Sequence, residues 1–204
     1  IRLARFHTYK HLSDFEITEG TKKLISEIVD SGEIAKLSPN RIWTETERAL
    51  SSSNPNIYFK ILLEYNLQKP YLDGLQSSFC DSSKNIQVRW AELQINNNFV
   101  LGEDLPIPNT FSNASKTLRM LSNIKLDSKE NELLKALQEI SFERNSVLIE
   151  SLVKLPHLEH TKQLILKLLS GMKETNFSVL ANIPKEQIEE EKFKLLIKVI
   201  KNCL

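Results

Sequence analysis

The sequence is poor in glycine and cysteine. Its 204 residues include 5 glycines and 2 cysteines, whereas leucine, isoleucine, lysine and glutamate are abundant. Scarce glycine together with these strong helix formers favours helices over sheets, so we expect an all-α fold. Cys80 and Cys203 are too few for a disulfide framework or a zinc site. This usage is typical of a reducing compartment, and we expect a cytoplasmic location.

Long apolar runs and a dominant charge are also missing. No stretch approaches the roughly 18 apolar residues that a membrane helix needs, and we recognise no signal peptide, so we expect no membrane partner. The formal net charge is +1, which provides no global field to attract nucleic acid. Any surface that binds nucleic acid must therefore be a local cluster of basic side chains.

Motifs for catalysis are absent too. The sequence has no glycine-rich phosphate loop and no nucleophile paired with a base, so we expect no catalytic residue in this chain. His7 and His11 are spaced four residues apart and could chelate a metal, but no third ligand lies near them in the sequence. We therefore expect no metal site here.

The most informative stretch is a predicted helix over residues 38–50. Ser38 is a suitable N-cap, and Pro39 occupies the first helical position, where its missing N–H costs nothing. Large and small apolar side chains fall on one face, with Trp43 as a structural anchor. We expect this tryptophan to be buried against one of three apolar side chains: Ile25, Ile28 or Leu62. We expect three charged side chains on the opposite, solvent-facing side: Arg41, Glu45 and Arg48.

Basic residues form three candidate clusters for RNA. The first lies in residues 1–11, which contain no acidic side chain and are suited to phosphate; it consists of Arg2, Arg5 and Lys10. The second is an outward pair on a predicted helix, Lys116 and Arg119. The third is a stripe on the last predicted helix: Lys194, Lys198 and Lys201. Glu190 is a favourable i, i+4 partner of Lys194, so part of this charge supports the helix. A solvated helix face is the alternative interpretation for each cluster.

Caps and apolar periodicity predict the remaining helices. We expect Thr18 to begin one that ends before Gly32, and Asp127 with Glu130 to begin another through a capping box. Gly171 is expected to end a helix that begins at Thr161. The other predicted helices cover residues 55–65, 86–93, 110–124 and 147–155 and a segment that begins near residue 184. Residues 66–85 are expected to form turns.

Four segments recur in an order that resembles a known family. These are residues 2–6 (Arg-Leu-Ala-Arg-Phe), 17–18 (Ile-Thr), 31–37 (Ser-Gly-Glu-Ile-Ala-Lys-Leu) and 38–50, with its Arg-Ile-Trp-x-Glu core. Together they resemble the neck of bacterial CCA-adding tRNA nucleotidyltransferases, which share a class with bacterial poly(A) polymerases. The Arg-Ile-Trp-x-Glu form looks more like the CCA-adding branch.

The resemblance implies a division into three parts. Residues 1–66 would be the neck, 67–126 the body and 127–204 the tail of an enzyme that adds CCA to tRNA 3′ ends. In such enzymes the neck shapes the nucleotide cleft, and the body and tail hold tRNA. The resemblance therefore implies a cleft role for Arg2, Arg5, Arg41 and Glu45, and tRNA contacts for the other basic residues of the three clusters.

The resemblance also implies what the chain does not carry. In the family, CTP and ATP are handled by an N-terminal head, whose clustered carboxylates hold Mg²⁺. This chain starts with Ile in what looks like a helix, and we expect it to be a fragment without that head. Several relatives also have a phosphohydrolase module with a His-Asp metal pair. Ile95 and Asn96 occupy the matching positions here and cannot replace those ligands.

Three alternatives stay open. The chain could be part of a bacterial poly(A) polymerase, because the resemblance covers both branches. It could be a free-standing helical RNA-binding module with no head. A helical protein-interaction scaffold would suit the near-neutral charge and predicts an exposed apolar groove.

Overall fold

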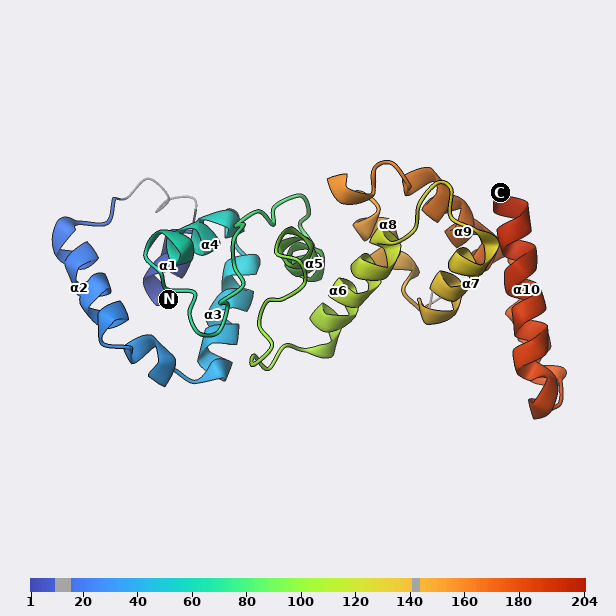
Figure 1. Ribbon diagram of the computed structural model, residues 1–204, viewed down its shortest axis with the longest axis horizontal. Coiled ribbons are helices and arrows are strands. Elements are labelled where there is room, and N and C mark those ends of the chain that lie inside the picture. The colour runs from blue at the N-terminus through green and yellow to red at the C-terminus, as the bar shows by residue number, and fades with distance from the viewer. Residues whose placement is uncertain (10–15, 141–143) are drawn as a thin grey trace. The chain divides into compact units, whose positions relative to one another are not determined.

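The fold is built from helices (Figure 1). The structure is a computed structural model that describes residues 1–9, 16–140 and 144–204. Within these ranges every regular element is a helix, and no strand occurs, so the expected all-α class is confirmed. None of the helices in the described ranges has both the length and the apolar character needed to cross a membrane.

The chain divides into two compact units. Unit 1 comprises residues 1–116 and unit 2 comprises residues 117–204. The boundary that we expected after residue 66 lies inside unit 1, whose hydrophobic core draws on side chains from both sides of it. The three-part functional division stays a prediction.

Unit 1 contains the helices that the sequence predicted from caps and periodicity. They are α1 (Arg2–Phe6), α2 (Glu19–Asp30), α3 (Pro39–Leu50), α4 (Pro55–Glu64), α5 (Ile86–Asn96) and the first part of α6 (Asn109–Ser122), with a 3₁₀ turn at Glu33–Lys36. The side chains of Thr18 and Ser38 accept the N–H groups of Thr21 and Arg41 as N-caps. Gly32 has a φ of 68°, which suits glycine best and ends α2.

Trp43 anchors the core of unit 1. It is 5% exposed, and its ring meets Trp90 of α5 and Phe111 of α6 edge to face, at centroid distances of 5.2 and 5.0 Å. The expected burial of Trp43 is confirmed. Its two ring contacts, with Trp90 and Phe111, were not among the neighbours that we expected. Ile28 is 41% exposed, so α2 offers less apolar cover than its sequence pattern indicated.

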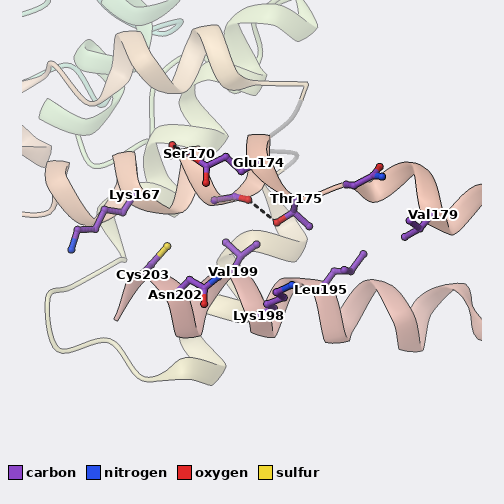
Figure 2. A pocket seen from close by; sticks show the side chains of 12 residues that line it. Lys167, Ser170, Glu174, Thr175, Val179, Leu195, Lys198, Val199, Asn202 and Cys203 are labelled. Carbon is purple, nitrogen blue, oxygen red and sulfur yellow. Dashed lines mark hydrogen bonds between the residues drawn. The ribbon is translucent and has the colours of Figure 1, made fainter.

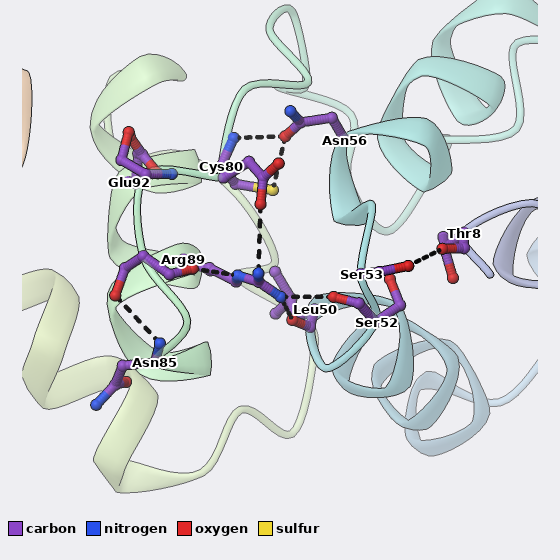
Figure 3. A network of polar contacts seen from close by, with 12 residues as sticks. Thr8, Leu50, Ser52, Ser53, Asn56, Cys80, Asn85, Arg89 and Glu92 are labelled. Atoms are coloured by element: carbon purple, nitrogen blue, oxygen red, sulfur yellow. Dashed lines mark hydrogen bonds and ion pairs between the residues drawn. The ribbon is translucent and has the colours of Figure 1, made fainter. Parts of the chain in front are cut away.

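Buried polar side chains of α5 hold the turns between α4 and α5 in place (Figure 3). Arg89 donates to the carbonyls of Leu50 and Ser52 at 2.6 and 2.7 Å and pairs with Asp81 at 3.3 Å. The fully buried Glu92 carboxylate accepts the backbone N–H and the hydroxyl of Ser82. These contacts tie the end of α3 and the turns before α5 directly to α5.

Unit 2 is organised around its last helix. α10 (Ile188–Cys203) packs against α9 (Lys162–Glu174) and α7 (Glu130–Glu139). The remaining elements are α8 (Ser146–Leu152) and 3₁₀ turns at Pro156–Leu158, Phe177–Asn182 and Lys185–Gln187. α10 buries Leu196, Val199, Ile200 and Cys203 on one face.

Two helix ends in unit 2 differ from expectation. α7 begins at Glu130 rather than near Asp127, because the Glu132 carboxylate accepts the N–H of Lys129 at 3.0 Å. α9 continues through Gly171 to Glu174. A Cβ on Gly171 would lie 2.9 Å from Cγ1 of Val199, so this glycine permits close approach of α9 to α10 instead of ending the helix.

Candidate nucleic-acid interface

A buried ion pair joins α1 to α3 in unit 1. Nε of Arg5 donates to the carboxylate of Glu45, and the two residues are 8% and 3% exposed. A second guanidinium nitrogen of Arg5 donates to the Tyr9 hydroxyl at 2.8 Å. The expectation that Arg5 lies on a cationic surface without an acidic partner is therefore wrong, because Glu45, forty residues later, faces it in the fold.

Glu45 also corrects the predicted phase of α3. It was expected in solvent beside Arg41 and Arg48, which are exposed as predicted. Because α1 packs on this side of α3, the Glu45 carboxylate is enclosed and becomes the partner of the α1 arginines. The sequence pattern assigned Glu45 to solvent, whereas tertiary packing buries it beside the buried guanidinium of Arg5.

Three arginines converge on this one carboxylate. Besides Arg5, Nε of Arg2 lies 3.8 Å from it and a guanidinium nitrogen of Arg48 lies 3.4 Å from it. The side chains of Arg2 and Arg48 are 59% and 61% exposed, so they keep donors available to a ligand. We call Arg2, Arg5, Arg48 and Glu45 the arginine cluster; it carries three positive charges and one negative charge. A buried anion that orients exposed guanidinium groups prepares them for phosphate.

Polar and aromatic groups lie beside the arginine cluster. A surface depression of about 420 Å³ is lined by Tyr9, Arg48, the acidic Glu47 and hydroxyl-bearing residues of α3 and the following turn. Phe6 and Tyr9 are 45% and 38% exposed, and the Arg5 guanidinium lies 4.5 Å from the Phe6 ring centroid. Exposed rings next to guanidinium groups are the side chains on which unpaired bases stack.

The remaining predicted contacts in this part of the chain are dispersed. Lys116 and Arg119 are both exposed on α6, and Arg119 has an interaction of its own. Lys10 and His11 lie outside the described residues. Their roles, like the cleft roles of Arg2, Arg41 and Glu45, stay predictions.

Ile95 and Asn96, which we expected to stand in place of a His-Asp metal pair, lie at the end of α5. Ile95 and Asn96 are half-buried, and the Asn96 amide donates to the Phe79 carbonyl at 3.0 Å. Nowhere in residues 1–9, 16–140 and 144–204 do three His, Cys, Asp or Glu side chains gather closely enough to hold a metal ion. Asn96 here supports the turn before α5.

The lysine stripe of α10 divides into residues with different surroundings. Lys194 pairs with Glu190 and Glu191 at 2.9 and 2.6 Å, and the hydrogen bonds to Glu191 and then Glu190 raise its pKa. Lys198 and Lys201 are exposed, and the structure assigns neither an ion pair within the residues that it describes. The three lysines therefore do not form an equivalent set.

Lys198 also lines a cavity of about 700 Å³ between α9 and α10 (Figure 2). Lys167 lines it from α9, together with Ser170, Glu174 and the Cys203 thiol. Burial raises the pKa of Cys203, which the nearby Lys167 partly opposes. Lys167 carries little signal in the sequence beyond its position on the polar side of α9. Arg48 was expected only as a solvent-facing residue, although it lies one helical turn from Glu45.

Comparison with known proteins finds similarity over about a third of the chain. Residues 14–78 match the family described as the probable RNA- and SrmB-binding site of polymerase A. A multifunctional CCA protein of Mannheimia succiniciproducens is 44% identical over 69 residues, which cover 34% of this chain and 16% of that protein. No solved structure matches. Over the part that these matches cover, the chain is similar to CCA-adding enzymes and to the RNA-binding segment of polymerase A.

Proposed function

We propose that this chain binds and positions tRNA in an enzyme that adds CCA to tRNA 3′ ends, with CTP and ATP as donors. The observation that carries the proposal is an overlap. Glu45 and Arg48 lie within the segment that matches an RNA-binding family, and they bring Arg2 and Arg5 of α1 into one cluster. Positioning a substrate supplies much of the rate when reacting groups must be aligned.

Nucleotide transfer itself is assigned to another part of the enzyme. It requires clustered carboxylates that hold Mg²⁺, and the metal would align the attacking hydroxyl with the triphosphate. The described residues hold no group of three metal-ligating side chains, so the residues present do not fit this ion. We therefore propose that Mg²⁺, CTP and ATP are bound by a catalytic head and that the 204 residues alone are inactive. The proposed location of the enzyme is the cytoplasm.

A second candidate is part of a bacterial poly(A) polymerase. The description of the matched family names polymerase A, whereas the relative is a CCA protein. The two candidates differ in the RNA that they extend. A CCA-adding enzyme requires tRNA, so this chain should bind tRNA better than a single-stranded RNA of equal length; the reverse preference would favour the polymerase.

Fluorescence anisotropy with labelled tRNA over a series of salt concentrations tests the proposal. Loss of a phosphate contact flattens the log–log salt dependence by roughly 0.7–0.9 per charge. The double variant Arg2→Ala/Arg48→Ala should therefore flatten it by about 1.5. Lys60→Ala/Lys84→Ala removes the same charge from exposed positions of unit 1 and serves as the matched control.

Two results would contradict the proposal. One is equal salt slopes for the arginine double variant and the lysine control, which would mean that the arginine cluster does not contact RNA. The other is incorporation of labelled CMP or AMP into tRNA by the purified 204-residue chain, which would show that catalytic groups lie within it.

A further inference from the structure

The cavity between α9 and α10 has the size and lining of a ligand site. Its volume of about 700 Å³ falls within the range of roughly 300–1,000 Å³ that small-molecule pockets occupy. One part of the lining carries hydroxyl and amide groups, from Ser170, Thr175, Asn176 and Asn202. Another part is apolar, with Val179, which is 42% exposed, and Leu195. A ligand with a polar and an apolar end would meet both.

The charge in this cavity comes mainly from two lysines on different helices. Lys167 stands on α9 and Lys198 on α10, and both are exposed. Within the described residues the structure pairs neither with an acid, whereas Lys162, Lys173 and Lys194 are each ion-paired. Available ammonium groups beside hydroxyl and amide donors form a site for an anion with several oxygens.

The acidic side chain in the lining does not cancel this charge. Glu174 lines the cavity, and its carboxylate accepts the Ser170 hydroxyl at 2.9 Å. One carboxylate against two lysines leaves a net positive charge. Glu174 also disfavours a ligand that is anionic throughout, so the occupant should place its negative charge near Lys167 and Lys198 and away from Glu174.

We propose that this cavity binds a nucleotide unit of an RNA chain, with backbone phosphates at Lys167 and at Lys198 and the ribose or base against Val179 and Leu195. The proposal deepens the proposed function and rests on it. It assigns unit 2 a defined contact through α9 as well as α10. It also assigns Lys198, but not Lys194, to RNA, because Lys194 already forms ion pairs with Glu190 and Glu191 of α10.

Single substitutions on α9 and α10 test the site in the full chain. Lys167→Ala and Lys198→Ala should each flatten the salt dependence of tRNA binding by roughly 0.7–0.9, and the double variant by about twice as much. Lys201→Ala removes the same charge from an exposed position of α10 outside the cavity, and it should leave the slope unchanged. Because the lysines are exposed, the substitutions should not unfold the chain.

The outcomes separate this site from the proposed function. If the parent chain binds no tRNA, the proposed function fails and this site fails with it. If the parent binds tRNA but the cavity variants keep its slope, or if Lys201→Ala changes the slope equally, the cavity proposal alone is overturned.

A free nucleotide could supply the same phosphate chemistry. Titrations of ¹⁵N-labelled chain with a short RNA, AMP and inorganic phosphate separate these sources through the side-chain amide signal of Asn202. We expect the RNA to shift this signal at concentrations where AMP and phosphate do not, and Lys198→Ala to weaken the shift. An equal response to AMP would overturn the assignment to RNA.

Discussion

The arginine cluster of unit 1 and the lysine stripe of unit 2 have similar sequence patterns but different structures. Both begin as basic residues spaced along helices, as expected for a phosphate-binding face. In unit 1 the Glu45 carboxylate, 3% exposed, gathers three arginines from two helices. In unit 2 the acidic side chains that contact the stripe lie on α10 itself. They form solvent-exposed ion pairs with Lys194.

The difference shows how burial changes the role of a charge. A buried carboxylate is costly unless a cation meets it, so removal of Glu45 or Arg5 should lower stability and also disturb the orientation of Arg2 and Arg48. An exposed pair is screened by water and by salt, and it contributes little to either. Substitution of Glu45 or Arg5 in unit 1 should therefore change folding and binding together, whereas substitution of Lys198 in the stripe should change binding alone.

Replacement of Glu45 should have a large effect on stability. Glu45→Gln leaves Arg5 buried without an anion, which should cost about 3–5 kcal/mol of unfolding free energy. Urea unfolding followed by tryptophan fluorescence reports unit 1, because both tryptophans belong to it. Glu47→Gln, two residues along the same helix, is the control. An unchanged urea midpoint for Glu45→Gln would mean that the Arg5 guanidinium is solvated and does not depend on Glu45.

Truncation of Trp43 should destabilise unit 1 to a similar extent through packing instead of charge. Trp43→Ala removes the ring between Trp90 and Phe111 and should cost about 3–5 kcal/mol. Trp90 remains as the fluorescent probe of urea unfolding. Melting like that of the parent chain would mean that the edge-to-face contacts do not support the core.

A medium effect is expected where α9 approaches α10. Gly171→Ala places a methyl group 2.9 Å from Val199, and overpacking of this kind costs about 1–3 kcal/mol. The better helix propensity of alanine offsets up to about 1 kcal/mol of this cost. We therefore expect a lower melting temperature, measured by circular dichroism. Gly20→Ala in α2, with nothing within 4 Å of the new methyl, should instead stabilise. A gain at both positions would show that the two helices can separate slightly.

The smallest effect is expected at Lys194. Its ion pairs with Glu190 and Glu191 are exposed, so Lys194→Ala should leave the melting temperature almost unchanged although two short contacts are lost. The same melting experiment checks this. A loss as large as that of Glu45→Gln would remove the distinction between the arginine cluster and the lysine stripe.

Local residue patterns by themselves determined the helical class and many helix ends. Thr18, Ser38 and Gly32 act through hydrogen bonds and backbone angles within a few residues, so their effects can be predicted from neighbours in the sequence. The apolar face of α10 and the burial of Trp43 could be predicted because helical periodicity decides which side chains share a face. The family resemblance came from the same residues.

Tertiary structure alone decided which charges meet. Glu45 is buried because α1 covers α3, and Lys167 becomes part of a cavity because α9 lies against α10. Gly171 continues a helix instead of ending it because Val199 of α10 approaches it. Each outcome depends on a partner 28 or more positions away, and periodicity within one helix carries no information about which helix will cover it. A buried ion pair and an exposed one can therefore arise from the same local pattern of charges.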